Sequence, residues 1–98
     1  MSVAYVGEMT FDLGEKRHVR CLVKPVCGQD QPFAIRSARW ELWNLWNADE
    51  MEASGECEID GHELDAYISP QARAAYRLAF IYEVADEIWV DNIKVKVG

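Results

Sequence analysis

The side chains that could do acid–base or metal chemistry are few in this 98-residue chain. Neither of its two histidines, His18 and His62, has a serine, cysteine or carboxylate spaced to complete a nucleophile–base pair. The acidic run 49–65 lacks the D-x-[DN]-x-[DN]-G loop that gathers oxygen ligands around calcium. Gly-rich phosphate-binding loops are absent as well. We therefore expect no enzymatic activity, no bound metal and no cofactor.

The cysteines are the other candidates for reactive groups, and they are Cys21, Cys27 and Cys57. Their number is odd and no two have C-x-x-C spacing, which argues against a metal site. Cys21 in VRCLV and Cys57 in GECEID are apolar residues next to charged ones, as inward-facing strand positions would be. We predict free buried thiols rather than a disulfide.

Negative charge is concentrated in one part of the chain, whose net charge is −7. Between Trp40 and Ala72 there is no lysine or arginine, but there are nine carboxylates: Glu41, Asp49, Glu50, Glu52, Glu56, Glu58, Asp60, Glu63 and Asp65. Such a surface repels phosphate backbones, so direct nucleic-acid binding is not expected. The acidic residues either keep a small protein soluble, attract a basic partner or mimic the charge of nucleic acid.

Alternation of apolar and polar residues indicates strands in three regions. HVRCLVK is the first, and GECEIDGHELDAYI (55–68) reads as a hairpin around Asp60-Gly61, a pair suited to a tight turn. The third region is the C-terminus, where Ile88 and Val90 are out of phase with the later apolar residues, which predicts a bulge near Asp91-Asn92. The inward side chains would be Val19, Cys21, Val23, Cys57, Ile59, Leu64, Ala66, Ile68, Ile93, Val95 and Val97.

The segment SPQARAAYRLAFIYEVADE (69–87) allows two interpretations. Ser69 could cap a helix over 70–85, with Pro70 at its first position. Aromatic and β-branched enrichment favours a strand instead. We predict a short helical turn at 70–74, then a strand over 75–84 that turns tightly at Ala85-Asp86. Its inward stripe would be Tyr76, Leu78, Phe80, Tyr82 and Val84.

Three of the four tryptophans fall in RWELWNLWN (39–47). On a strand, Trp40 and Trp46 share one face and Trp43 points the other way with Glu41. We predict Trp40 in the core, Trp46 as a cover on the sandwich end within a loop over 44–49, and Trp43 as an exposed contact residue. The candidate interaction surface combines two aromatic and four acidic residues: Trp43, Tyr67, Glu56, Glu58, Glu63 and Asp65.

About seven short strands in fewer than a hundred residues are typical of one antiparallel β-sandwich domain. Trp40 lies on the presumed third strand, and Tyr76 opens the penultimate strand after the proline-containing corner ISPQARAAY. Leu78 stands where antibody domains carry their second cysteine. The chain therefore resembles immunoglobulin-like sandwiches without the inter-sheet disulfide, and in particular the small immunoglobulin-like structural proteins of tailed bacteriophages and prophages. Residues 15–98 carry the resemblance, whereas residues 1–14 do not match and are expected to form an edge strand or an arm.

The resemblance implies a non-enzymatic structural or protein-binding module of a virion tail, neck or baseplate. Its partners would be other proteins, copies of itself included, and neither nucleic acid nor a membrane. The first twenty residues contain no signal-peptide or membrane-span pattern, so the expected location is the virion or the bacterial cytoplasm. One alternative is an acidic inhibitor that mimics nucleic acid, argued from the base-free stretch 40–72. The other is a carbohydrate-binding sandwich that uses Trp43 and Tyr67.

Overall fold

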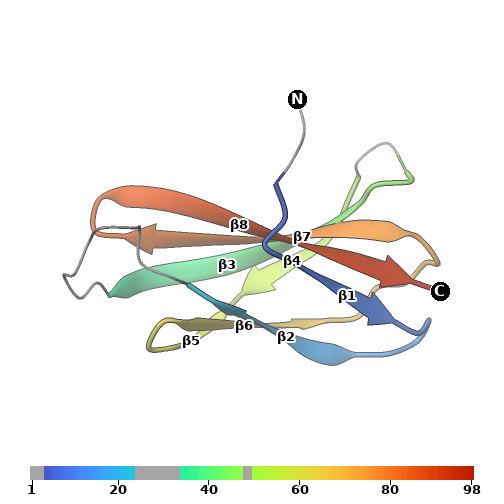
Figure 1. Cartoon of the computed structure of the whole chain (residues 1–98), viewed down its shortest axis with the longest axis horizontal. Coiled ribbons are helices and arrows are strands. Elements are labelled where there is room, and N and C mark those ends of the chain that lie inside the picture. Colours follow the sequence, from blue (N-terminus) through green and yellow to red (C-terminus); the bar gives the residue numbers. More distant parts are fainter. Residues whose placement is uncertain (1–3, 24–33, 48–49) are drawn as a thin grey trace.

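Residues 4–23, 34–47 and 50–98 are described by the computed structural model, and within them eight strands form two sheets (Figure 1). The strands are β1 (Gly7–Phe11), β2 (Arg17–Leu22), β3 (Ile35–Asn44), β4 (Glu50–Glu56), β5 (Glu58–Asp60), β6 (Glu63–Ile68), β7 (Ala75–Val84) and β8 (Glu87–Val97). The large sheet has the order β1-β8-β7-β3-β4, and the small sheet has the order β2-β6-β5. Cys21 is a free buried thiol, as predicted; Cys57 is free but only partly buried, and Cys27 lies outside the described residues. The expected all-β sandwich is confirmed.

The core lies between the two sheets and is built by the alternation seen in the sequence. Nearly all of the side chains that the pattern turned inward are buried, including those of Val19, Leu64, Ala66, Ile68, Tyr76, Leu78, Phe80, Ile93 and Val95. Phe11, from the edge strand β1, is also fully buried. β1 pairs with β8 in parallel, whereas the other pairs of described strands are antiparallel. The residues before position 15 thus supply both an edge strand and part of the core.

Residues 75–84 form β7, as predicted, and residues 69–74 are irregular, so the helix over 70–85 is wrong, and so is the helical turn at 70–74. The backbone N–H groups that would begin such a turn have tertiary partners instead. The Gln71 N–H donates to Glu52 Oε2 at 3.1 Å, and the Ala72 N–H donates to the Tyr76 hydroxyl at 3.2 Å. The predicted tight return at Ala85-Asp86 is present, and Ala85 has a φ of 55° there.

The first half of β8 differs from the prediction. β7 and β8 pair in one continuous register from Ala75↔Lys96 to Val84↔Glu87, so the bulge expected near Asp91-Asn92 is absent. As a result Ile88 and Val90 are exposed, 70% and 50% respectively, while Trp89 packs against the core. The register shifts that involve β3 lie between Ile35 and Ser37 and between Leu42 and Trp43.

Strand β4 was not expected, because the hairpin was predicted to begin at residue 55. Its inward residues, Ala53 and Gly55, are small, so the alternation is faint. At Cys57 the chain leaves the large sheet and enters the small one as β5. β5 is only three residues long and lies at an edge, so Ile59, predicted to face inward, is 39% exposed. This change of sheet forms a corner that is important for the site.

Candidate functional site

The outward side chains of the small sheet form a charged surface that we call the acidic face: His18 and Arg20 on β2, Glu63, Asp65 and Tyr67 on β6, and Glu58 and Asp60 on β5. Cross-strand pairing sets their neighbours, since His18 is opposite Tyr67, Arg20 opposite Asp65, and Asp65 opposite Glu58. Pairing on an antiparallel sheet brings opposing side chains into contact distance. Four of the six predicted interaction residues therefore lie together on this face.

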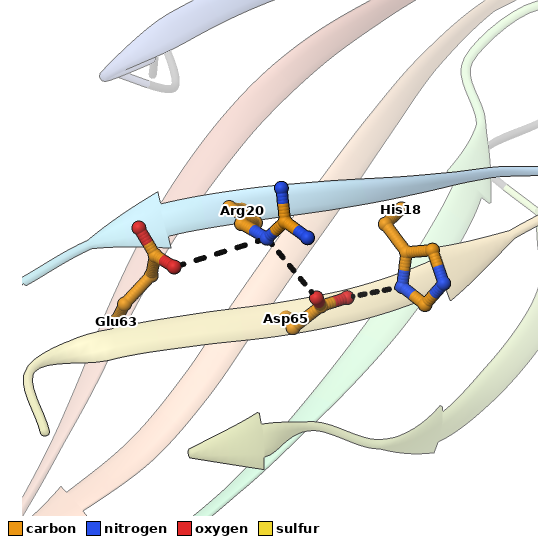
Figure 2. Close-up of polar contacts among 4 residues, drawn as sticks. All are labelled: His18, Arg20, Glu63 and Asp65. Atoms are coloured by element: carbon orange, nitrogen blue, oxygen red, sulfur yellow. Dashed lines mark hydrogen bonds and ion pairs between the residues drawn. The ribbon is translucent and has the colours of Figure 1, made fainter. Parts of the chain in front are cut away.

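Asp65 is the centre of the ion pairs on the acidic face (Figure 2). His18 Nδ1 lies 2.7 Å from Asp65 Oδ1, and Arg20 Nε lies 3.3 Å from Asp65 Oδ2 and 3.8 Å from Glu63 Oε1. The His18 ring also stacks on Tyr67, with centroids 4.3 Å apart, and Lys16 Nζ lies 4.7 Å from the Tyr67 centroid. Among the described residues, Arg20 and Lys16 are thus the cations seen at this face, and they contact Asp65, Glu63 or Tyr67.

The nine carboxylates of the base-free stretch have different roles in the structure. Glu52 accepts hydrogen bonds from Tyr76 and Gln71, Glu50 accepts one from Asn47, and Glu41 accepts one from Trp43. Asp49 lies outside the described residues. Of these nine acids, three of those that the structure describes have neither an ion pair nor a side-chain hydrogen bond: Glu56, Glu58 and Asp60. These three acids follow one another through the corner between β4 and β5.

A cleft of about 320 Å³ opens at this corner, and we call it the corner cleft. It is lined by Trp40, Gly55, Glu56, Glu58, Asp65 and Tyr67, beside His18. Gly55 is required here, because a Cβ at that position would be 2.9 Å from Nε1 and Cζ2 of Trp40. The predicted core residue Trp40 is 9% exposed, so it is buried as expected and at the same time supplies a wall of the cleft.

Trp43 does not belong to this site. It lies on the outer face of the large sheet, in register with Met51 and Arg77, whereas Tyr67 faces outward from the small sheet. Its indole is half-buried, since its Nε1 donates to Glu41 at 3.2 Å and the Arg77 guanidinium lies 5.4 Å from its ring centroid. Trp43 and Tyr67 therefore cannot form one aromatic patch. Trp46, predicted to cover the sandwich end, is instead 73% exposed in the turn after β3.

A second, larger cleft of about 880 Å³ lies between the sheets, next to β1 and β2. Within it the Tyr82 hydroxyl donates to Asp91 Oδ2 at 2.9 Å, and Cys21 Sγ lies 3.9 Å from the same oxygen. Burial, reinforced by the negative charge of Asp91, raises the pKa of the Cys21 thiol to about 12. Burial also raises the pKa of the Cys57 thiol to about 12. Both thiols are therefore protonated at neutral pH and are poor nucleophiles.

The chemical capacity of the acidic face follows from these contacts. A histidine held by a carboxylate can orient a base, yet no serine, threonine or cysteine among the described residues contacts His18. Nor does the described part of the chain contain three His, Cys, Asp or Glu side chains grouped to hold a metal ion. The arrangement is best suited to attracting a positively charged surface. None of the described segments is a helix that could span a membrane.

Sequence reasoning missed the His18–Asp65–Arg20 cluster, and it missed the contribution of Trp40 and Gly55 to a cleft. The alternation in RHVRCL places His18 and Arg20 outward on their own strand, so the sequence could predict that these two side chains share a face. The sequence could not predict that β2 pairs with β6, which brings Asp65 next to them. The sequence matches no protein-family model, and no curated protein matches it either.

Proposed function

We propose that this protein is a non-enzymatic protein-binding module whose acidic face docks on a basic surface of another protein. The observation that carries the proposal is that Glu58 and Asp60 on this face, and Glu56 on β4 at the adjoining corner, have no ion pair among the described residues, beside the exposed ring of Tyr67. Unpaired charges at a protein surface steer partners of opposite charge. Tyrosine is among the residues enriched at binding sites.

The topology supports an immunoglobulin-like assignment within this proposal. In constant-type immunoglobulin domains the third, sixth and seventh strands form one sheet, and the second, fourth and fifth lie in the other. With β2 as the second strand and β4 as an added strand beside the third, the order here follows that scheme. The Tyr76 hydroxyl accepts from a backbone N–H four residues upstream, as in a tyrosine corner. The pattern resemblance to bacteriophage structural proteins makes a virion the setting that we propose for the partner.

The test begins with capture of the tagged native protein from its producing host or virion, followed by reconstitution with the purified partner. We expect calorimetry to show binding that weakens as salt rises, because exposed charges are screened. The double variant Glu56→Gln/Glu58→Gln should weaken binding by about tenfold, since each exposed charge pair contributes up to ~1 kcal/mol. The control Asp86→Asn/Glu87→Gln removes the same charge from the exposed turn of the β7–β8 hairpin and should bind like the wild type.

Binding that is insensitive to salt, or equally weakened by both double variants, would reject the acidic face as the docking surface. A particle that lacks the protein but assembles and infects normally would reject the virion setting. If the captured partner is a nucleic-acid-binding protein and DNA competes for it, the acidic-mimic alternative replaces the structural role. The acidic surface available for mimicry is limited, because Glu41, Glu50 and Glu52 hydrogen-bond within the protein.

A further inference from the structure

The corner cleft contains a polar group that the fold does not satisfy. The indole N–H of Trp40 has no hydrogen-bond acceptor among the described residues, although the residue is nine-tenths buried. In that same part of the chain no fully buried nitrogen or oxygen is left without a partner, so this N–H must still reach solvent. Nε1 lies against Gly55, at the wall of the cleft. The cleft therefore offers a donor to whatever enters it.

The opposite wall supplies negative charge and an aromatic ring. Glu56 and Glu58 line the cleft without a counter-ion among the described residues, and Tyr67 lies beside them. Lys16 Nζ is already 4.7 Å from the Tyr67 centroid, so the ring attracts a cation in this environment. A ligand that binds both the Trp40 N–H and the carboxylates of Glu56 and Glu58 must carry a hydrogen-bond acceptor and a cation.

The backbone next to the cleft is also available for pairing. β5 pairs only with Glu63, Leu64 and Asp65, so the edge of β6 from Ala66 to Ile68 has no strand on that side in the described part of the chain. An open edge accepts an extended peptide by strand addition. A peptide carries a carbonyl at every residue, which is the acceptor that Trp40 requires.

We propose that the corner cleft binds an extended segment of the partner protein through an arginine residue. A carbonyl of that segment accepts from Trp40 Nε1, and the guanidinium lies between Glu56 and Glu58 and takes the place of Lys16 at the Tyr67 ring, which His18 stacks on as well. Arginine suits this place better than lysine, because its planar group pairs with carboxylates and stacks on aromatic rings at the same time. This inference rests on the proposed protein-binding function and names the chemistry of the partner.

The probe is the capped peptide acetyl-Ala-Arg-Ala-amide, titrated into the ¹⁵N-labelled protein while the indole N–H resonances of the four tryptophans are followed. We expect the Trp40 resonance to move downfield and saturate, and the resonances of Trp43, Trp46 and Trp89 to change little. The citrulline peptide, which has the same shape without the charge, should bind several times more weakly. Glu58→Gln should weaken arginine-peptide binding by about threefold, the size expected for one exposed charge pair. Glu87→Gln, at the exposed start of β8 and outside the lining of the cleft, is the matched control and should leave it unchanged.

The inference is overturned if the Trp40 resonance stays in place, if arginine and citrulline peptides bind equally, or if Glu87→Gln weakens binding as much as Glu58→Gln. Its failure is distinguishable from failure of the proposed function. If the peptide does not bind but the purified partner still binds in an acid-dependent way, the docking face stands and the arginine site is wrong. If the peptide binds while no protein partner depends on the acidic face, the arginine site stands and the proposed docking function is wrong.

Discussion

Ala79, at the middle of the large sheet's outer face, is 1% exposed, whereas Tyr67, on the outer face of the small sheet, is 47% exposed. Long side chains fold over the large sheet. Arg77 lies over the Trp43 ring and donates to Asn92 Oδ1 at 3.4 Å, and Trp43 in turn donates to Glu41. Around Trp43 the large sheet's outer face therefore pairs its own aromatic and polar groups, whereas the Glu83 carboxylate on the same face has no ion pair or hydrogen bond among the described residues. On the acidic face Glu58 and Asp60 have no ion pair among the described residues, so a basic partner can form new ion pairs there.

This difference teaches that an exposed aromatic residue in a sequence is a weak guide to a binding surface. Trp43 was expected to be the leading contact residue because it alternates with Trp40 on one strand. Its neighbours on β7 and β3 cover it, and those neighbours could not be read from its own strand. What distinguishes the small sheet is that β5 carries no cation, and that Arg39, which is opposite Glu56 in the register, pairs with Glu41 instead.

The largest effect that this comparison predicts is on stability between the sheets. Phe80→Ala removes a fully buried ring from β7 and should lower the free energy of unfolding by about 3–5 kcal/mol, because a cavity replaces the ring. Tyr67→Ala on the acidic face should cost less than about 1 kcal/mol. Urea denaturation of both variants measures the difference. Equal losses would show that the acidic face is a structural element rather than a binding surface.

A smaller loss is expected from Gly55→Ala. The added Cβ would lie 2.9 Å from the Trp40 indole, so ring or strand must shift, at a cost of about 1–3 kcal/mol. Gly7→Ala is the matched control, since the nearest atom to its Cβ would be Ile93 Cγ1 at 4.0 Å. Thermal unfolding of the two variants checks this prediction. A neutral Gly55→Ala would mean that the wall of the corner cleft is more adaptable than the geometry implies.

The two described thiols make stability depend on alkaline pH. Burial raises the pKa of Cys21 and of Cys57 from 9.0 to about 12, so the folded state favours the protonated thiols. Their contribution is fully present below pH 9 and is lost as pH rises from 9 toward 12. We expect the urea midpoint to fall across that window, and to fall less steeply in Cys21→Ala. Rapid alkylation of Cys21 by iodoacetamide at pH 8 in the folded protein would contradict its burial.

The smallest effects compare the two outer faces directly. Trp43→Leu should destabilise by about 1 kcal/mol, because it removes the ring under Arg77 and the donor to Glu41. Asp65→Asn, which loses the ion pair with Arg20 and weakens the contact with His18 at a partly exposed site, should cost about 0.2–1 kcal/mol. Both are measured by denaturant titration at low and high salt. Only the destabilisation caused by Asp65→Asn should become smaller as the salt concentration rises. If instead only the Trp43→Leu effect became smaller, the large sheet's outer face would be the one that depends on charge.

Much of the fold could be predicted from alternation alone. The inward residues of β2, β6 and β7 and of the second half of β8 are buried as expected, because a strand turns successive side chains to opposite faces. The prediction of a helical turn at 70–74 was wrong because the backbone N–H groups of Gln71 and Ala72 donate to the side chains of Glu52 and Tyr76 instead. The bulge in β8 was wrong because Ile88 and Val90 are exposed apolar residues, and a pattern cannot distinguish exposed from buried valine or isoleucine.

The sequence by itself determined that this protein is an all-β sandwich with a buried Trp40 and an acidic surface around Glu58 and Asp65. Each of those properties depends on the order of residues within a single strand. Only the tertiary structure decided that β6 lies between β2 and β5, that Gly55 lies against the Trp40 indole, and that Trp43 is on another face. Strand pairing is set by long-range packing, so the neighbours that turn acidic residues into a site cannot be read from their own segment.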